Sequence, residues 1–286
     1  MICSSLARES SGPGSAAAAA VVGAFLLVTA ATGCRAPEDP LGTWASYLGD
    51  DARTHYSSLK QIHRGNVGRL EVAWTYQSGD LRENDLSQIQ TNPIIVDTVL
   101  YGVSPGLSAF AIHAATGSEI WTFRPSEHYD SPGETSGVLR GVAYWSGGRE
   151  RRILFTAGPY LYAFDARTGW AVWRYRTSGP IISSPALANG VVFIGSADKH
   201  LYALDARNGR ILWKYETEGQ VTSSPAYANG AVYFGGIDNY VYSVDAETGE
   251  LRWRFKTGGP VPSSPEVRDD IVYIGSTDRY VYAIPA

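Results

Sequence analysis

The chain has 286 residues and a net charge of −4 at neutral pH, with 18% charged residues, 12% aromatic residues and 31 glycines. This length suits one domain with a sizeable core, and the negative net charge, without any basic run, excludes electrostatic attraction to nucleic acid. Few charges combined with many aromatic residues and glycines are typical of a turn-rich all-β protein.

The first 33 residues have the features of a targeting segment. Arg8 is the only positive charge ahead of the apolar run 16–31, which is short for a membrane span, and Ala-Thr-Gly-Cys follows, ending at Cys34. This resembles a bacterial lipoprotein processing site. We therefore predict a signal peptide over 1–33, lipidation of Cys34 and a tether over 34–41, which would place the protein in the periplasm, anchored to a membrane. The alternative is an ordinary secretory signal or an uncleaved anchor.

Residues 70–76 read Leu-Glu-Val-Ala-Trp-Thr-Tyr, which predicts a short strand carrying Trp74. Later tryptophans stand at the end of the pattern Ala-x-Asp-x-x-Thr-Gly-x-x-x-Trp, complete from Ala163 to Trp173. A residue that recurs once per unit serves the contact between units, so we predict that each indole packs against the neighbouring sheet. These predicted docking residues are Trp74, Trp121, Trp173, Trp213 and Trp253.

The C-terminal part of the chain repeats one unit every 40 residues, most visibly in Ser183-Ser184-Pro185, which recurs at 223–225 and 263–265. Short runs of β-branched and aromatic residues, separated by Asn, Asp and Gly, predict three strands in the first copy, at 190–194, 201–204 and 211–215. With the Ser-Ser-Pro-Ala segment as a first strand, each unit is predicted to have four antiparallel strands.

A single four-stranded sheet cannot bury both of its faces, and no stretch after residue 40 has the apolar spacing of a covering helix. The sheets must therefore stack on one another, and units of this length with one Trp each predict a β-propeller over 42–286. The last unit lacks a Trp strand and the segment 70–76 lacks a preceding unit. We predict five blades, with this segment completing the last one; the alternative is an open arc of a larger ring.

The repeated tryptophan pattern resembles the docking motif of the pyrroloquinoline quinone (PQQ) repeat superfamily, which includes quinoprotein alcohol and glucose dehydrogenases and outer-membrane assembly lipoproteins. Residues 42–170 are similar to the opening of a PQQ-dependent dehydrogenase, and residues 171–286 to the plain repeats of the assembly propellers. The stretches that carry the first similarity are 56–62, 70–76, 90–97, 140–145 and 153–158.

The resemblance implies a cofactor role for Arg140, whose guanidinium suits the carboxylates of PQQ. Gln90 stands where many relatives have a cofactor-facing Glu. No cysteine follows residue 34 to form the disulfide on which many alcohol-oxidising relatives stack the quinone, and their later calcium-binding and catalytic residues are not matched. No catalytic residue and no metal ligand is therefore assigned.

Two functional hypotheses follow. The first is a membrane-tethered scaffold that binds protein partners and has lost dehydrogenase activity. The second is a PQQ-dependent oxidoreductase, or a fragment of one, which would use PQQ with Ca²⁺ to oxidise a sugar or an alcohol. The substrate, the partner and the oligomeric state are left open by the sequence.

Overall fold

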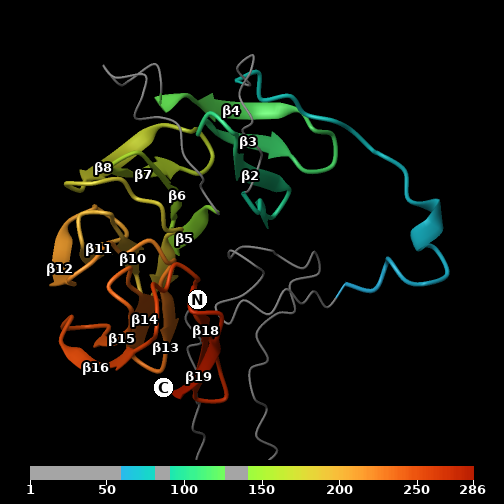
Figure 1. Cartoon of the computed structure of the whole chain (residues 1–286). Coiled ribbons are helices and arrows are strands. Elements are labelled where there is room, and N and C mark those ends of the chain that lie inside the picture. The colour runs from blue at the N-terminus through green and yellow to red at the C-terminus, as the bar shows by residue number, and fades with distance from the viewer. Residues whose placement is uncertain (1–58, 81–90, 126–140) are drawn as a thin grey trace, which may run out of the picture. The chain divides into compact units, whose positions relative to one another are not determined.

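A computed structural model describes residues 59–80, 91–125 and 141–286. Within these ranges the regular structure consists of β-strands and one short 3-10 helix, η1 (Val67–Arg69). The strands form five antiparallel sheets that follow one another in chain order (Figure 1). The all-β prediction is confirmed.

We number the five sheets 1 to 5 in chain order. Sheet 3 shows how one repeat folds. Its strands are β9 (Ala186–Ala188), β10 (Val191–Gly195), β11 (His200–Asp205) and β12 (Ile211–Glu216), each paired with the next. Asn189 and Gly190 have φ values of 51° and 76°, which give the two-residue turn between β9 and β10 its left-handed backbone. The Asp205 carboxylate accepts hydrogen bonds from the N–H groups of Arg207 and Asn208 in the turn before β12.

The three strands predicted at 190–194, 201–204 and 211–215 correspond to β10, β11 and β12. The first strand differs from the prediction, because it begins at Ala186, after the Ser-Ser-Pro segment. Pro185 has no N–H for a strand ladder, and the two serines before it make hydrogen bonds of another kind, described below.

Three further sheets have the same four-stranded order, and sheet 5 has three strands within the described ranges. Sheet 1 contains β1 (Ile94–Val96), β2 (Val99–Val103), β3 (Ala109–His113) and β4 (Glu119–Phe123). Sheet 2 contains β5 (Ala143–Gly147), β6 (Glu150–Ala157), β7 (Tyr160–Asp165) and β8 (Ala171–Arg176). Sheet 4 contains β13 (Ala226–Ala228), β14 (Ala231–Gly235), β15 (Tyr240–Asp245) and β16 (Leu251–Lys256). Sheet 5 contains β17 (Glu266–Arg268), β18 (Ile271–Gly275) and β19 (Val281–Pro285).

The hydrophobic core lies between consecutive sheets. Four clusters of buried side chains each join two neighbours in chain order; Phe193 of sheet 3, for example, shares a cluster with Phe234 and Tyr242 of sheet 4. A third strand such as β11 is covered on both faces, so Leu201 to Leu204 are all buried and the strand lacks the alternation of a half-exposed sheet. In an outermost strand such as β12, exposed and half-buried residues alternate because one face of the strand meets solvent.

The first strands of successive sheets lie side by side: β5 contacts β9, β9 contacts β13, and β13 contacts β17. A parallel bridge between Asn92 and Gly141 makes the corresponding link between the segments that lead into β1 and β5. Stacked four-stranded sheets whose first strands adjoin are the arrangement of a β-propeller, as predicted.

The expected strand pairing between residues 70–76 and the last sheet is not present in the described part of the chain. The segment 70–77 forms no strand, and β18 is the only strand that pairs with β19 there. Val72 is 80% exposed and Val281 is 78% exposed, so neither segment covers the other. Among the described residues sheet 5 therefore has three strands, and β18 is the one strand paired with β19.

Candidate functional sites

The two residues predicted to contact a quinone, Arg140 and Gln90, lie outside the described residues, as does Cys34. Among the described residues, Asn92 and Gly141 form a parallel bridge; in the sequence Asn92 is two residues after Gln90, and Gly141 directly follows Arg140. The described chain immediately after each predicted residue therefore converges on one place, at the start of sheets 1 and 2.

The tryptophans lie at the junctions between sheets. Each of four indoles donates its Nε1–H to an alanine carbonyl in the following sheet: Trp74 to Ala114 (3.0 Å), Trp121 to Ala166 (3.0 Å), Trp173 to Ala206 (3.2 Å) and Trp213 to Ala246 (3.1 Å). Each ring also covers the glycine of the following turn, where an added Cβ would come within 2.7 Å of the indole. Trp253 packs against the cluster between sheets 4 and 5. These contacts build the fold rather than a ligand site.

The serines of the Ser-Ser-Pro segment also join structural elements. Ser183 Oγ accepts from the N–H of Gly195 at 2.8 Å and donates to its carbonyl at 2.9 Å, which fixes the segment to its own sheet. The N–H of Ser184 donates to Oγ of Ser224, one repeat later, at 2.9 Å. Both bonds are repeated in the next copy, so the segment is a structural joint.

A third repeated contact involves an aspartate in the turn between the second and third strands. Asp238 Oδ2 accepts from the hydroxyl of Tyr242 at 2.7 Å and from the N–H groups of Glu218 and Gly219 in the connection from sheet 3. Burial, and after it this carboxylate, raises the pKa of Tyr242. Asp198 and Asp278 have the same role. In the described ranges no three His, Cys, Asp or Glu side chains gather in a way that could hold a metal ion.

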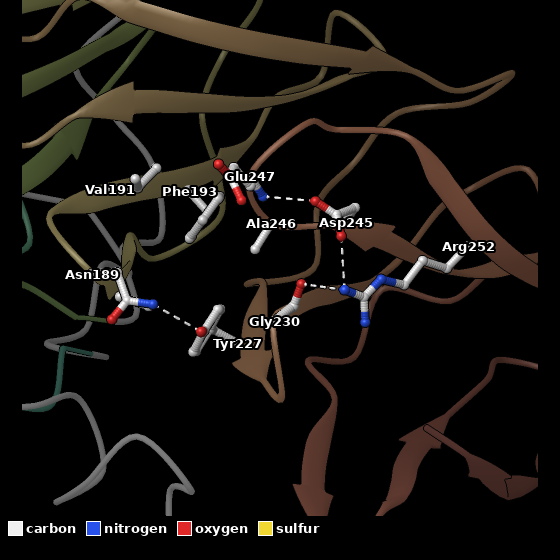
Figure 2. Close-up of a pocket in the computed structure, with 10 residues that line it drawn as sticks. Asn189, Val191, Phe193, Tyr227, Gly230, Asp245, Ala246, Glu247 and Arg252 are labelled. Carbon is white, nitrogen blue, oxygen red and sulfur yellow. Dashed lines mark hydrogen bonds and ion pairs between the residues drawn. The ribbon is translucent and has the colours of Figure 1, made fainter.

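A groove of about 380 Å³ lies between sheets 3 and 4 (Figure 2). Phe193 and Tyr227 form part of its apolar wall, with ring planes 7° apart. Arg252 lies on the other side, where it bonds Asp245 Oδ2 and the Gly230 carbonyl, both at 2.7 Å. The hydrogen bond from Arg252 holds the pKa of Asp245 down to about 2.

The prediction from sequence missed this groove. Its distinctive residues are those that differ between repeats: Tyr227 occupies the position of Leu187, and Arg252 that of Leu212. Such departures within an otherwise regular repeat are the signal that could have located it. The walls suit an apolar group flanked by polar atoms. The charges of Arg252 and Asp245, however, are already paired with each other.

No helix among the described residues has both the length and the apolar character needed to cross a membrane. The predicted signal peptide over 1–33 and the tether over 34–41 lie outside the described residues.

Comparison with known proteins agrees with the resemblance noted in the sequence. Residues 44–182 match a family model described as the β-propeller domain of glucose/ethanol/alcohol dehydrogenase. Residues 217–286 match a second family model, described as outer membrane protein assembly factor BamB. The chain is 32% identical over 173 residues to the dehydrogenase subunit of a quinone alcohol dehydrogenase from Komagataeibacter europaeus, covering 56% of this chain and 22% of that protein. It is 33% identical over 203 residues to a quinohemoprotein alcohol dehydrogenase from Comamonas testosteroni, covering 67% and 26% respectively.

Solved structures share the fold. Quinohemoprotein alcohol dehydrogenase ADHIIG from Pseudomonas putida aligns with a TM-score of 0.70 at 24% identity, over 85% of this chain and 46% of that one. BamB from Moraxella catarrhalis aligns with a TM-score of 0.56 at 22% identity, over 70% and 59%. The chain thus spans about a quarter of the length of the curated dehydrogenases that it matches. The predicted resemblance to PQQ-repeat propellers, dehydrogenase-like first and BamB-like later, is confirmed.

Proposed function

We propose that this protein is a lipid-anchored propeller of the bacterial periplasm that binds another polypeptide, as a binding or assembly scaffold. The observation that carries the proposal is the edge of sheet 5 that no described residue covers. There β19 has one hydrogen-bonded neighbour among the described residues. Tyr280, which precedes β19, is 68% exposed, and Val281, its first residue, is 78% exposed.

An open strand edge presents a row of N–H and C=O groups that an extended peptide can pair with, and exposed apolar side chains beside it add contact area. Tyr273, on the neighbouring strand β18, is also exposed and extends the apolar surface across the sheet. The edge thus offers both the hydrogen bonds and the side-chain contacts that strand addition uses.

The similarity of residues 217–286 to an outer-membrane assembly factor includes sheet 5 and supports a scaffold role. The sequence around Cys34 supports attachment to a membrane by lipid, which would hold the propeller close to envelope partners. A protein partner is therefore proposed, and no nucleic acid.

The edge can be tested by replacing Val281 with the photo-crosslinking residue p-benzoylphenylalanine in the full chain, expressed with its leader in a bacterium. A matched control carries the same residue in place of Val172, which is 44% exposed on the outer strand β8. Irradiation should give one discrete adduct with an envelope protein from position 281 and none from position 172.

Two results would contradict the proposal. Adducts that form equally from both positions would indicate random collision. An adduct between position 281 and the peptide containing residues 70–76 of the same chain would mean that the edge is closed internally, as the sequence first predicted, and is not a partner site.

The second candidate is a PQQ-dependent oxidoreductase acting on a sugar or an alcohol. Two observations favour it: the dehydrogenase match over residues 44–182, and the bridge that brings together the chain after Gln90 and Arg140. Arg140 would hold a carboxylate of PQQ and Gln90 would offer an amide, while bound PQQ would supply the redox chemistry. No described residues are assigned to the Ca²⁺ ion that accompanies the quinone.

Mixing the purified chain with PQQ and Ca²⁺ separates the two candidates. PQQ binding is followed by quenching of protein fluorescence, and turnover by dye reduction with glucose or ethanol. Binding and turnover that disappear in Arg140→Ala but persist in Arg149→Ala, an exposed control, would establish the oxidoreductase and overturn the scaffold as the main function. Absence of quenching would remove the second candidate.

A further inference from the structure

A second cavity, of about 400 Å³, lies between the outer strand of sheet 1 and sheet 2. Its lining combines aromatic and aliphatic side chains with one arginine: Phe123, Tyr162, Ala171, Val172, Trp173 and Arg174. It is separate from the groove of Figure 2 and from the junction of Asn92 with Gly141.

The cavity exists because sheet 2 departs from the repeat. Ala171 occupies the position that Ile211 and Leu251 hold in the next two sheets. Exchanging a branched four-carbon side chain for a methyl group leaves space beside Trp173, and the rings of Phe123 and Tyr162, with centroids 5.4 Å apart, provide an apolar wall.

The polar groups depart from the repeat as well. Tyr202 and Tyr242, which correspond to Tyr162, donate their hydroxyls to turn aspartates, but the turn before Tyr162 has Gly158 at the aspartate position. The side chain of Tyr162 is 3% exposed and hydrogen-bonds with Arg174 instead. A cationic group thus stands where the later sheets place an anion.

The charged side chains among the described residues at this site are arginines. Arg174 and Arg176 both lie over the ring of Tyr160, at 5.4 and 5.6 Å from its centroid, and in the described ranges neither arginine has a carboxylate partner. The corresponding Arg254 of sheet 4 pairs with Glu218 at 3.4 Å. An exposed guanidinium at the mouth of an aromatic cavity is suited to a carboxylate attached to an apolar ring.

We propose that this cavity binds a small aromatic carboxylate, with the ring between Phe123, Val172 and Trp173 and the carboxylate on Arg174 and the hydroxyl of Tyr162. The site is independent of the proposed scaffold function, because it lies on sheets 1 and 2 and does not involve β19.

The test is isothermal titration calorimetry of the purified full chain with 2-naphthoate, and with 2-naphthamide as its uncharged equivalent. We expect saturable binding of naphthoate that exceeds binding of the amide. Arg174→Gln should weaken naphthoate binding at least about tenfold, since a charge-assisted hydrogen bond is lost. Lys214→Gln, the equivalent change in sheet 3, should leave it unchanged.

A second variant separates the cavity from the charge. Ala171→Leu introduces the residue that sheet 4 has at this position, so the variant should fold, and it should abolish binding by filling the cavity. The proposal is overturned if naphthoate does not bind at millimolar concentration, if the amide binds as well as the acid, or if Ala171→Leu binds as the unmodified protein does.

Discussion

Ser184 and Ser224 are joined across one whole repeat: the main-chain N–H of the first donates to Oγ of the second at 2.9 Å, with both residues buried. Ser224 in turn donates to Ser264 at 3.0 Å. These bonds tie the starts of sheets 3, 4 and 5 together, where each sheet meets the next.

Replacing Ser224 by alanine should remove the acceptor for the buried N–H of Ser184 while leaving the backbone of residue 224 intact. Leaving a buried donor without a partner costs about 1–3 kcal/mol. We therefore expect the free energy of unfolding in urea to fall by that amount. Ser178→Ala, at an exposed position, is the control; an equal loss in both variants would show that the bond does not stabilise the fold.

Gly249 and Gly190 allow the steric part of tryptophan docking to be measured. Their φ values are 77° and 76°, but a Cβ at Gly249 would lie 2.7 Å from the indole of Trp213, whereas a Cβ at Gly190 would meet nothing within 4 Å. Gly190→Ala should cost about 1–2 kcal/mol for its backbone conformation alone. Gly249→Ala should cost about 1–3 kcal/mol more, because the ring must move.

Thermal or urea unfolding of the two alanine variants provides the comparison. Equal losses of stability would mean that these glycines serve only the left-handed backbone, and that the indole yields to a methyl group without cost.

Stability should fall steeply at alkaline pH. Burial raises the pKa of Tyr101 to about 12, and its hydroxyl donates to the carbonyl of Ala166 at 3.1 Å. Between pH 10 and 12 the folded protein keeps this proton while the unfolded chain loses it, so the free energy of unfolding decreases as pH rises. Tyr101→Phe should reduce the slope of melting temperature against pH in this window. Tyr280→Phe, at a residue that is 68% exposed, is the control.

A second pH effect is expected at acid pH. The pKa of Asp245 is lowered to about 2 by the hydrogen bond from Arg252 and by the N–H groups of Thr248 and Glu247. The stability that this carboxylate contributes is present above its unfolded pKa of about 4 and is lost as pH falls towards 2. In Asp245→Asn the melting temperature should therefore change less with pH over that range. Asp269→Asn is the control, because the side chain of Asp269 is 91% exposed.

The repeating fold could be predicted from the sequence because its signals are local and recur. Asn-Gly and Asp-containing turns separate short apolar runs in each copy, and the strands found at β10, β11 and β12 follow them closely. A residue that returns once per repeat, such as Trp213, similarly indicated a contact between neighbouring units before its acceptor, the carbonyl of Ala246, was known.

Other features depend on atoms that are distant in the sequence. The serines before Pro185 were predicted to begin a strand, yet their partners are Gly195 and, one repeat later, Ser224. The pairing of residues 70–76 with β19 was inferred from complementary ends, which indicates compatibility but not contact. The cavity near Arg174 depends on Ala171 being small where other copies are large, and only the packed sheets reveal the resulting space.

The bonds that connect one sheet to the next occur at the same positions in successive copies, 40 residues apart. If residues 185–224 were excised, Ser184 would precede Pro225 in an unchanged local sequence, and its N–H would face Ser264 in place of Ser224. Duplication or deletion of a whole 40-residue module would therefore preserve this serine contact between the two sheets that meet at the seam.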